Sequence, residues 1–249
     1  EEQRKEIENS RREKLKREKP FVYEKIMNYD EKLMRGESTA IVDFCFDYKC
    51  NMHCTHCSNA NFAKKERALT IDDLKDFARQ ADKLGLAQFN ISGGEPLCFD
   101  NLDDIILALN PERFHISMST NGLLLTPERA RHLKEIGLDK MKISLDSIDE
   151  EVYMQTRQAA GTYEKAKESL FIAKDSGIQT AIQTVISHQN CQTKATEELA
   201  KFANDNGFNL DIMIARAIGR WEGKEEVLIT PEDNDFLLNI RYKYPVVHR

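Results

Sequence analysis

Residues 50 to 57, CNMHCTHC, place three cysteines and two histidines within one short segment. Cysteine thiolates and histidine nitrogens are preferred protein ligands of zinc, and thiolates hold iron–sulfur clusters. A disulfide and a catalytic thiol are also open to such residues. A chain of 249 residues needs no disulfide framework, however, and three cysteines crowded into one segment are distributed as metal ligands are. The segment therefore predicts a metal centre.

The number of cysteines leaves two kinds of metal centre open. Three is one fewer than the four ligands of closed zinc sites and of ordinary iron–sulfur clusters. His53 or His56 could supply a fourth ligand, which would give a Cys₃His zinc site in a binding module. Alternatively, Cys50, Cys54 and Cys57 bind a [4Fe-4S] cluster in which one iron is open to an exchangeable ligand. An open coordination position indicates reactivity rather than a structural role.

The elements that position this segment follow a regular alternation from residue 39 onward. Short apolar runs predict strands at 39–46, 87–92, 113–119, 140–146, 178–187 and 208–216. Amphipathic segments predict helices near 70–84, 101–109, 126–136, 162–176, 192–206 and 230–240. Strict alternation predicts a parallel sheet with right-handed crossovers. We therefore predict an α/β fold, a partial (β/α)₆ barrel with its chemistry at the carboxyl ends of the strands.

The first 38 residues lie outside this alternation. Residues 1–19 hold eight basic and six acidic side chains, which predicts a solvated helix or a disordered arm. Residues 21–37 carry apolar positions at helical spacing, which predicts one helix. The expected organisation is an N-terminal helical extension over 1–38 and the partial barrel over 39–249.

Composition excludes several classes of protein. The net charge of −6 argues against a surface for nucleic acid. No apolar run approaches the roughly 20 residues that span a bilayer, so no membrane partner is expected. The N-terminal residues lack the apolar core of a secretory signal, which predicts a cytoplasmic location.

The cysteine spacing resembles the CxxxCxxC signature of the radical S-adenosylmethionine (SAM) superfamily. Later stretches resemble motifs of that family in the family's order: SGGEPL at 92–97, STNG at 119–122 and SLDS at 144–147. Two glycines at a strand end let the backbone approach a ligand, and a neighbouring carboxylate can accept hydrogen bonds from an ammonium group. The resemblance covers about residues 39–216 and is nearest to the branch that holds SPASM-type maturases and the molybdopterin-precursor cyclase.

The resemblance implies a role for each motif. Cys50, Cys54 and Cys57 would hold three irons of a [4Fe-4S] cluster, and SAM would bind the fourth. Nine residues would contact SAM: His56 near the adenine, Gly93, Gly94, Glu95, Pro96, Thr120, Asn121, Ser144 and Arg157. A guanidinium suits a carboxylate because it binds in bidentate fashion. Asp146 is a further candidate for cofactor or substrate, and the inward or rim candidates are Gln183, Thr184, Met213 and Arg216. No residue is predicted to handle the substrate radical.

The activity that the resemblance implies is reductive cleavage of SAM to a 5′-deoxyadenosyl radical, which takes hydrogen from a peptide or a small polar metabolite. A reductant such as flavodoxin or ferredoxin would supply the electron. A nucleotide-rearranging cyclase is the alternative enzyme; its C-terminal Gly-Arg-Arg motif is absent, and Gly219-Arg220-Trp221 is the nearest string. Many members of the branch carry a cysteine-rich C-terminal extension for auxiliary clusters, whereas no cysteine follows Cys191 here.

Overall fold

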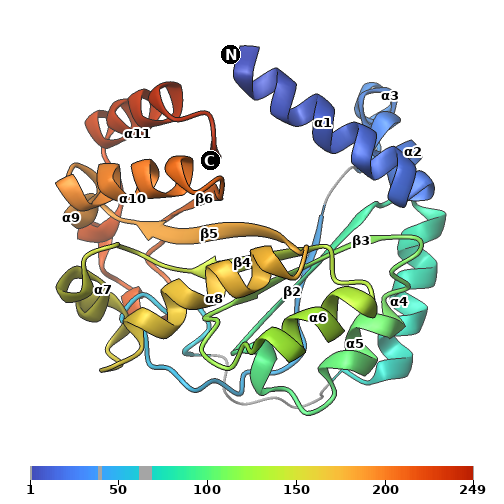
Figure 1. Cartoon of the computed structure of the whole chain (residues 1–249), viewed down its shortest axis with the longest axis horizontal. Helices are drawn as coiled ribbons and strands as arrows, with labels where there is room; N and C mark the ends of the chain where they lie inside the picture. The colour runs from blue at the N-terminus through green and yellow to red at the C-terminus, as the bar shows by residue number, and fades with distance from the viewer. Residues whose placement is uncertain (1, 39–40, 62–68, 249) are drawn as a thin grey trace.

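The computed structural model of the protein describes residues 2–38, 41–61 and 69–248. One sheet of seven parallel strands runs in the order β1 to β7, so each strand pairs with its neighbours in sequence (Figure 1). The strands are β1 (Val42–Cys45), β2 (Gln88–Ser92), β3 (His115–Thr120), β4 (Lys140–Ser144), β5 (Gln179–Ile186), β6 (Asn209–Ile214) and β7 (Val247–His248). The partial-barrel prediction is confirmed. Residues 39 and 40 of the first predicted strand lie outside the described residues, and the short β7 was not predicted.

The six predicted helices are confirmed and cover the outer face of the sheet (Figure 1). They are α4 (Ile71–Lys83), α5 (Leu102–Ala108), α6 (Pro127–Glu135), α8 (Tyr163–Asp175), α10 (Lys194–Asp205) and α11 (Pro231–Lys243). Further helices occupy the connections: η1 (Pro96–Cys98), α7 (Glu150–Arg157), α9 (His188–Cys191), η2 (Gly219–Trp221) and η3 (Glu225–Val227). Three of these connections, η1, α7 and η2, lie next to the cysteine segment or its partners.

Threonine caps fix where three of the helices begin. The hydroxyls of Thr70, Thr126 and Thr230 each accept a hydrogen bond from the backbone N–H three residues later. At Thr70 and Thr230 the aspartate at that position bonds back to the cap, which completes a capping box. Each cap fixes the residue at which its helix begins, and thus the length of the loop between the preceding strand and that helix.

The inner face of the sheet is polar, unlike that of most parallel sheets. In β4, Met141 and Ile143 are buried in the apolar core, whereas Lys140, Lys142 and Ser144 alternate with them and face the other side. Parallel strands covered on both faces usually read as continuous apolar runs. A polar inner face indicates a hollow that holds ligand rather than a packed barrel centre.

The N-terminal residues fold into three helices, α1 (Glu2–Glu18), α2 (Pro20–Met27) and α3 (Tyr29–Met34). The prediction of one helix over 21–37 is wrong, because the chain leaves helical geometry at Asn28 (φ −86°, ψ 3°). Asparagine side chains compete with helical backbone hydrogen bonds and therefore favour helix ends. The division of the chain at residues 38 and 39 stays a prediction.

Of the two alternatives predicted for residues 1–19, the solvated helix is confirmed in the described residues, because most side chains of α1 are exposed. Helix α1 is also attached to the barrel. Lys19, which directly follows α1, bonds Asp139 and donates to the carbonyl of Phe114 at 3.0 Å. Arg11 donates to Asn209 Oδ1 at 2.5 Å, where β6 begins, so α1 crosses the amino ends of the strands. Within the described segments, no helix combines the length and apolarity that crossing a membrane requires.

Candidate active site

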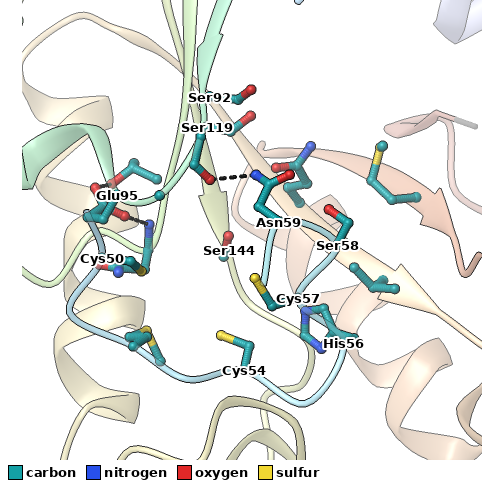
Figure 2. Close-up of a pocket in the computed structure, with 18 of the residues that line it drawn as sticks. Cys50, Cys54, His56, Cys57, Ser58, Asn59, Ser92, Glu95, Ser119 and Ser144 are labelled. Atoms are coloured by element: carbon teal, nitrogen blue, oxygen red, sulfur yellow. Dashed lines mark hydrogen bonds between the residues drawn. The ribbon is translucent and has the colours of Figure 1, made fainter. Parts of the chain in front are cut away.

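The cysteine segment forms a loop after β1, at the carboxyl ends of the strands. Figure 2 shows the sulfur atoms of Cys50, Cys54 and Cys57 on the inner side of this loop, facing a common space. That space is part of a pocket of about 430 Å³ that extends into the barrel. The loop and the pocket are therefore where parallel α/β folds place their chemistry.

Backbone pairing with the end of β2 holds the start of the loop. Gly94 N donates to Asp47 O at 2.8 Å, and Glu95 N donates to Lys49 O at 2.8 Å. A Cβ atom on Gly94 would lie 2.1 Å from Lys49 O, so only glycine permits this approach. The first effect of the GGEP stretch is thus to fasten the cysteine loop to the sheet.

The middle of the loop rests on the end of α7. Thr55 donates to the carbonyl of Thr156 through its N–H at 2.9 Å and its hydroxyl at 3.2 Å. The last carbonyls of a helix have no partner within the helix and accept such bonds readily. Helix α7 lies outside the six helices that the alternation predicts, so this support was not foreseen.

The end of the loop is held by η2, the segment after β6. Arg220 N donates to Cys57 O at 3.1 Å, and the Arg220 guanidinium lies 3.0 Å from His53 Nδ1. Gly219 has a φ of 61°, and a Cβ atom there would lie 2.2 Å from Cys57 O. The string that weakly matched a cyclase motif therefore supports the loop.

Glu95 links the GGEP stretch to the TNG stretch. Its side chain is buried and accepts hydrogen bonds from the Thr120 hydroxyl, from Leu97 N at 3.0 Å and from Asn121 N at 2.7 Å. Burial raises the pKa of this carboxyl, and the three donors only partly oppose the rise. Asn121 in turn donates to Asn51 Oδ1 at 2.7 Å, which connects the network to the cysteine loop.

A second buried carboxylate, Asp146, lies beyond the end of β4 and holds an arginine. Arg157 Nε donates to Asp146 Oδ2 at 2.6 Å, and Arg157 Nη1 donates to Cys54 Sγ at 3.6 Å. The Thr156 hydroxyl, the N–H of Val185 and the Thr184 hydroxyl also donate to the carboxylate, at 3.0 Å, 3.2 Å and 3.4 Å. Burial by itself would raise the pKa of Asp146, but the Arg157 guanidinium and the hydrogen bonds to the carboxylate together outweigh burial and lower the pKa to about 2.

His56 forms part of the pocket wall beside Cys57. Its ring lies 5.7 Å from that of Trp221, and its buried Nδ1 has no hydrogen-bond partner in the described residues. Burial lowers the pKa of His56 to about 4, which keeps the ring neutral at pH 7. A neutral, flat ring with one free nitrogen is suited to lie against a nucleobase.

The donor set fits a cluster better than a single ion. Among the residues that the structure describes, no three His, Cys, Asp or Glu side chains come close enough to hold one metal ion. In a cluster, each cysteine binds a different iron, so the sulfurs are spaced around a larger group. No disulfide joins the cysteines, all of which are described. Burial raises the pKa of the Cys50 thiol to about 11, so metal binding must displace its proton.

Most of the residues predicted from the sequence meet at this pocket. Those that line it are Cys50, Cys54, Cys57, His56, Gly93, Gly94, Glu95, Thr120, Asn121, Ser144, Arg157, Gln183, Met213 and Arg216. Pro96 does not line it and begins η1, and the buried Thr184 donates to Asp146 Oδ1 at 3.4 Å.

Other residues that line the pocket were not foreseen, among them Asp43, Asn59, Ser92, Ser119 and Trp221. Three of them could have been found, because Asp43, Ser92 and Ser119 stand at alternating strand positions that face the barrel interior.

Comparisons with known proteins agree with this geometry. The family model described as the Radical SAM superfamily matches residues 46–203. The chain is 35% identical over 130 residues to a probable GTP 3′,8-cyclase of Methanocella arvoryzae, covering 52% of this chain and 42% of that protein. It is 27% identical over 197 residues to an AdoMet-dependent heme synthase of Methanosarcina barkeri, covering 78% and 55%.

A solved structure resembles the fold. The crystal structure of Streptococcus suis SuiB bound to S-adenosylmethionine superposes with a TM-score of 0.68 at 16% identity, over 86% of this chain and 51% of SuiB. The chain spans about half the length of the curated relatives it matches.

Proposed function

Because the chain belongs to the radical SAM superfamily of enzymes, which use a [4Fe-4S] cluster and SAM, we propose that Cys50, Cys54 and Cys57 hold the cluster. The observation that carries the proposal is the convergence of three thiols from one loop on a pocket at the strand ends. Bound there, the cluster and SAM supply a 5′-deoxyadenosyl radical that takes a hydrogen atom from substrate. The chain's own residues bind, orient and shield these groups.

The SAM contacts follow from the lining of the pocket. Glu95 Oε2 accepts one protein hydrogen bond, from Asn121 N, and therefore keeps a lone pair for the amino group of SAM. We assign His56 to the adenine and Ser144 to the ribose or carboxylate. Arg157 bonds Asp146 through Nε and Cys54 Sγ through Nη1, so only its Nη2 is left for the same groups. The backbone at 93–95 and the side chains of Thr120 and Asn121 complete the set, whereas Pro96 lies outside the lining of the pocket. These assignments rest on position in the pocket and on the chemistry of each group.

The substrate would bind deeper, where the pocket meets the polar inner face of the sheet. Asp43 Oδ1 accepts from Ser92 Oγ at 2.8 Å, and Ser119 and Gln183 line the same region. Hydroxyl, amide and carboxylate groups favour a substrate rich in hydrogen-bonding groups, which suits a peptide or a small polar metabolite. We propose a cytoplasmic enzyme that takes its electron from a donor of the flavodoxin or ferredoxin type.

The cysteine assignment is tested with two matched variants purified without oxygen. The wild-type protein and Cys98→Ala are expected to bind about four irons per chain and to form 5′-deoxyadenosine with dithionite and SAM. Cys98 lies in η1 and does not line the pocket. Cys54→Ala is expected to lose both properties. Continued formation of 5′-deoxyadenosine by Cys54→Ala would contradict the assignment, and stoichiometric zinc in wild type would favour the binding-module alternative.

A nucleotide cyclase is the second candidate function. The observation that favours it is the similarity to a protein described as a probable GTP 3′,8-cyclase. The polar inner face would also accept a nucleotide. Adding GTP should then raise 5′-deoxyadenosine formation above the substrate-free level and consume GTP in equal amount. No consumption of GTP would leave the peptide or polar metabolite as the proposed substrate.

A further inference from the structure

The buried pair of Asp146 and Arg157 reaches the metal ligands directly, which the proposed function does not explain. Both residues are 6% exposed. One nitrogen of the guanidinium bonds the carboxylate, and a second bonds Cys54 Sγ at 3.6 Å. Because two of its three nitrogens already bond protein groups, the guanidinium is not free to bind a ligand carboxylate in bidentate fashion.

The surroundings of the pair fix the guanidinium in place. Asp146 accepts from the Thr156 hydroxyl at 3.0 Å and from Val185 N at 3.2 Å, so β5 and α7 both hold the carboxylate. Thr156 O accepts from Thr55 N at 2.9 Å, next to Cys54. The carboxylate, the arginine and the ligand loop are thus fastened to one another through two sets of bonds.

A fixed positive charge beside a ligand sulfur changes how readily a cluster accepts an electron. One-electron reduction adds one negative charge to a cluster and its thiolates, and net charge and hydrogen bonds to the sulfurs set the potential. A buried charge is little screened by solvent, so its effect on a neighbouring group is larger than at the surface.

We propose that Arg157 is a positioning residue for the cluster: its guanidinium, oriented by Asp146, donates to the Cys54 thiolate and raises the reduction potential. The inference rests on the proposed function, because it requires a cluster on Cys54. The step it concerns is the transfer of one electron from a low-potential donor to the oxidised cluster, with no proton taken up and no covalent bond made. Arg157 acts on this step through Cys54.

The test is a redox titration of the loaded protein without SAM, in which the reduced cluster is followed by electron paramagnetic resonance. Arg157→Gln is expected to shift the reduction equilibrium at least tenfold toward the oxidised form, which is 59 mV for one electron. Arg157→Lys keeps the charge and should recover more than half of the shift. Arg131→Gln is the control, because Arg131 is exposed, pairs with Glu128 on α6 and does not line the pocket.

A double variant guards against loss of folding. Arg157→Gln leaves Asp146 buried without its cation, whereas Asp146→Asn with Arg157→Gln replaces both charges by neutral amides. The double variant should also shift toward the oxidised form, by a smaller factor, because the removed cation lies nearer the sulfur than the removed anion.

The outcomes separate this inference from the proposed function. Four irons per chain with an unchanged potential in Arg157→Gln or in the double variant would overturn the inference and leave the function standing. Loss of the cluster in every Arg157 variant, with normal loading of wild type, would also overturn it, since the residue would then only support the loop. No cluster in wild type would overturn the proposed function itself.

Discussion

Two buried carboxylates, Glu95 and Asp146, connect to different parts of the cysteine loop and are stabilised in opposite ways. Glu95 accepts hydrogen bonds from neutral donors, and burial raises its pKa. Asp146 pairs with Arg157, and its pKa falls to about 2 although burial opposes this. The difference indicates that one side of the site arranges backbone around a ligand, while the other side fixes a charge beside the metal.

Of the changes that distinguish the two carboxylates, removal of the Asp146 carboxylate is expected to lower the free energy of unfolding most. Asp146→Ala leaves the Arg157 guanidinium buried without its counter-charge, which is expected to cost about 3–5 kcal/mol of unfolding free energy. Urea denaturation of the metal-free protein at pH 7 measures the cost. A loss below about 1 kcal/mol would mean that solvent reaches the pair.

The depressed pKa of Asp146 predicts how that stability depends on pH. A carboxyl whose folded pKa is lowered stabilises the protein above its unfolded pKa near 3.9 and loses this contribution as pH falls toward about 2. The difference in unfolding free energy between wild type and Asp146→Asn should therefore shrink by about 2 kcal/mol over that window. A difference that stays constant between pH 4.5 and pH 2 would contradict the assigned ion pair.

The raised pKa of Glu95 predicts the opposite slope. Its protonated form is favoured in the folded protein, so its contribution is present below the unfolded pKa and is lost as pH rises. Glu95→Gln is expected to cost about 1 kcal/mol at pH 4, because one donor then faces an amide NH₂. The cost should be smaller at pH 7. Urea titrations at the two pH values measure it, and a cost that grew with pH would contradict a raised pKa for Glu95.

The smallest effects come from the hydroxyl donors. Thr120 is buried and donates to Glu95, whereas Thr156 is half-buried and donates to Asp146, which Arg157 also holds. Thr120→Val is expected to cost about 1–2 kcal/mol and Thr156→Val about 0.5 kcal/mol. Thermal or urea unfolding of the two variants measures the difference, and equal costs would mean that the arginine does not relieve Asp146 of its need for neutral donors.

Sequence reasoning found the features that depend on local order. Helix starts at Thr70, Thr126 and Thr230 could be predicted because each threonine hydroxyl bonds the backbone N–H only three residues later. The strands could be predicted from short apolar runs. The cysteine spacing and the GGEP, TNG and SLD stretches located the pocket because each lies at a strand end.

Contacts between distant segments could not be predicted in the same way. Arg157 and Cys54 are 103 positions apart, and their contact depends on where α7 ends. A guanidinium at position 157 looks equally suited to a ligand carboxylate until its partners are known. The attachment of α1 to the barrel was missed for a related reason. The charged side chains of a helix bond the groups that the fold brings next to them, and the sequence alone does not show which groups those are.

The contact of η2 with the cysteine loop also orders events during synthesis. Arg220 and His53 are 167 positions apart, so the ribosome makes the three cysteines long before the segment that holds the end of their loop. The ribosome adds roughly 5–20 residues per second, and a domain generally folds as a unit once its later segments have been made. We therefore expect the loop to reach its final shape only after η2 has been made, so that iron and sulfide enter a nearly complete barrel.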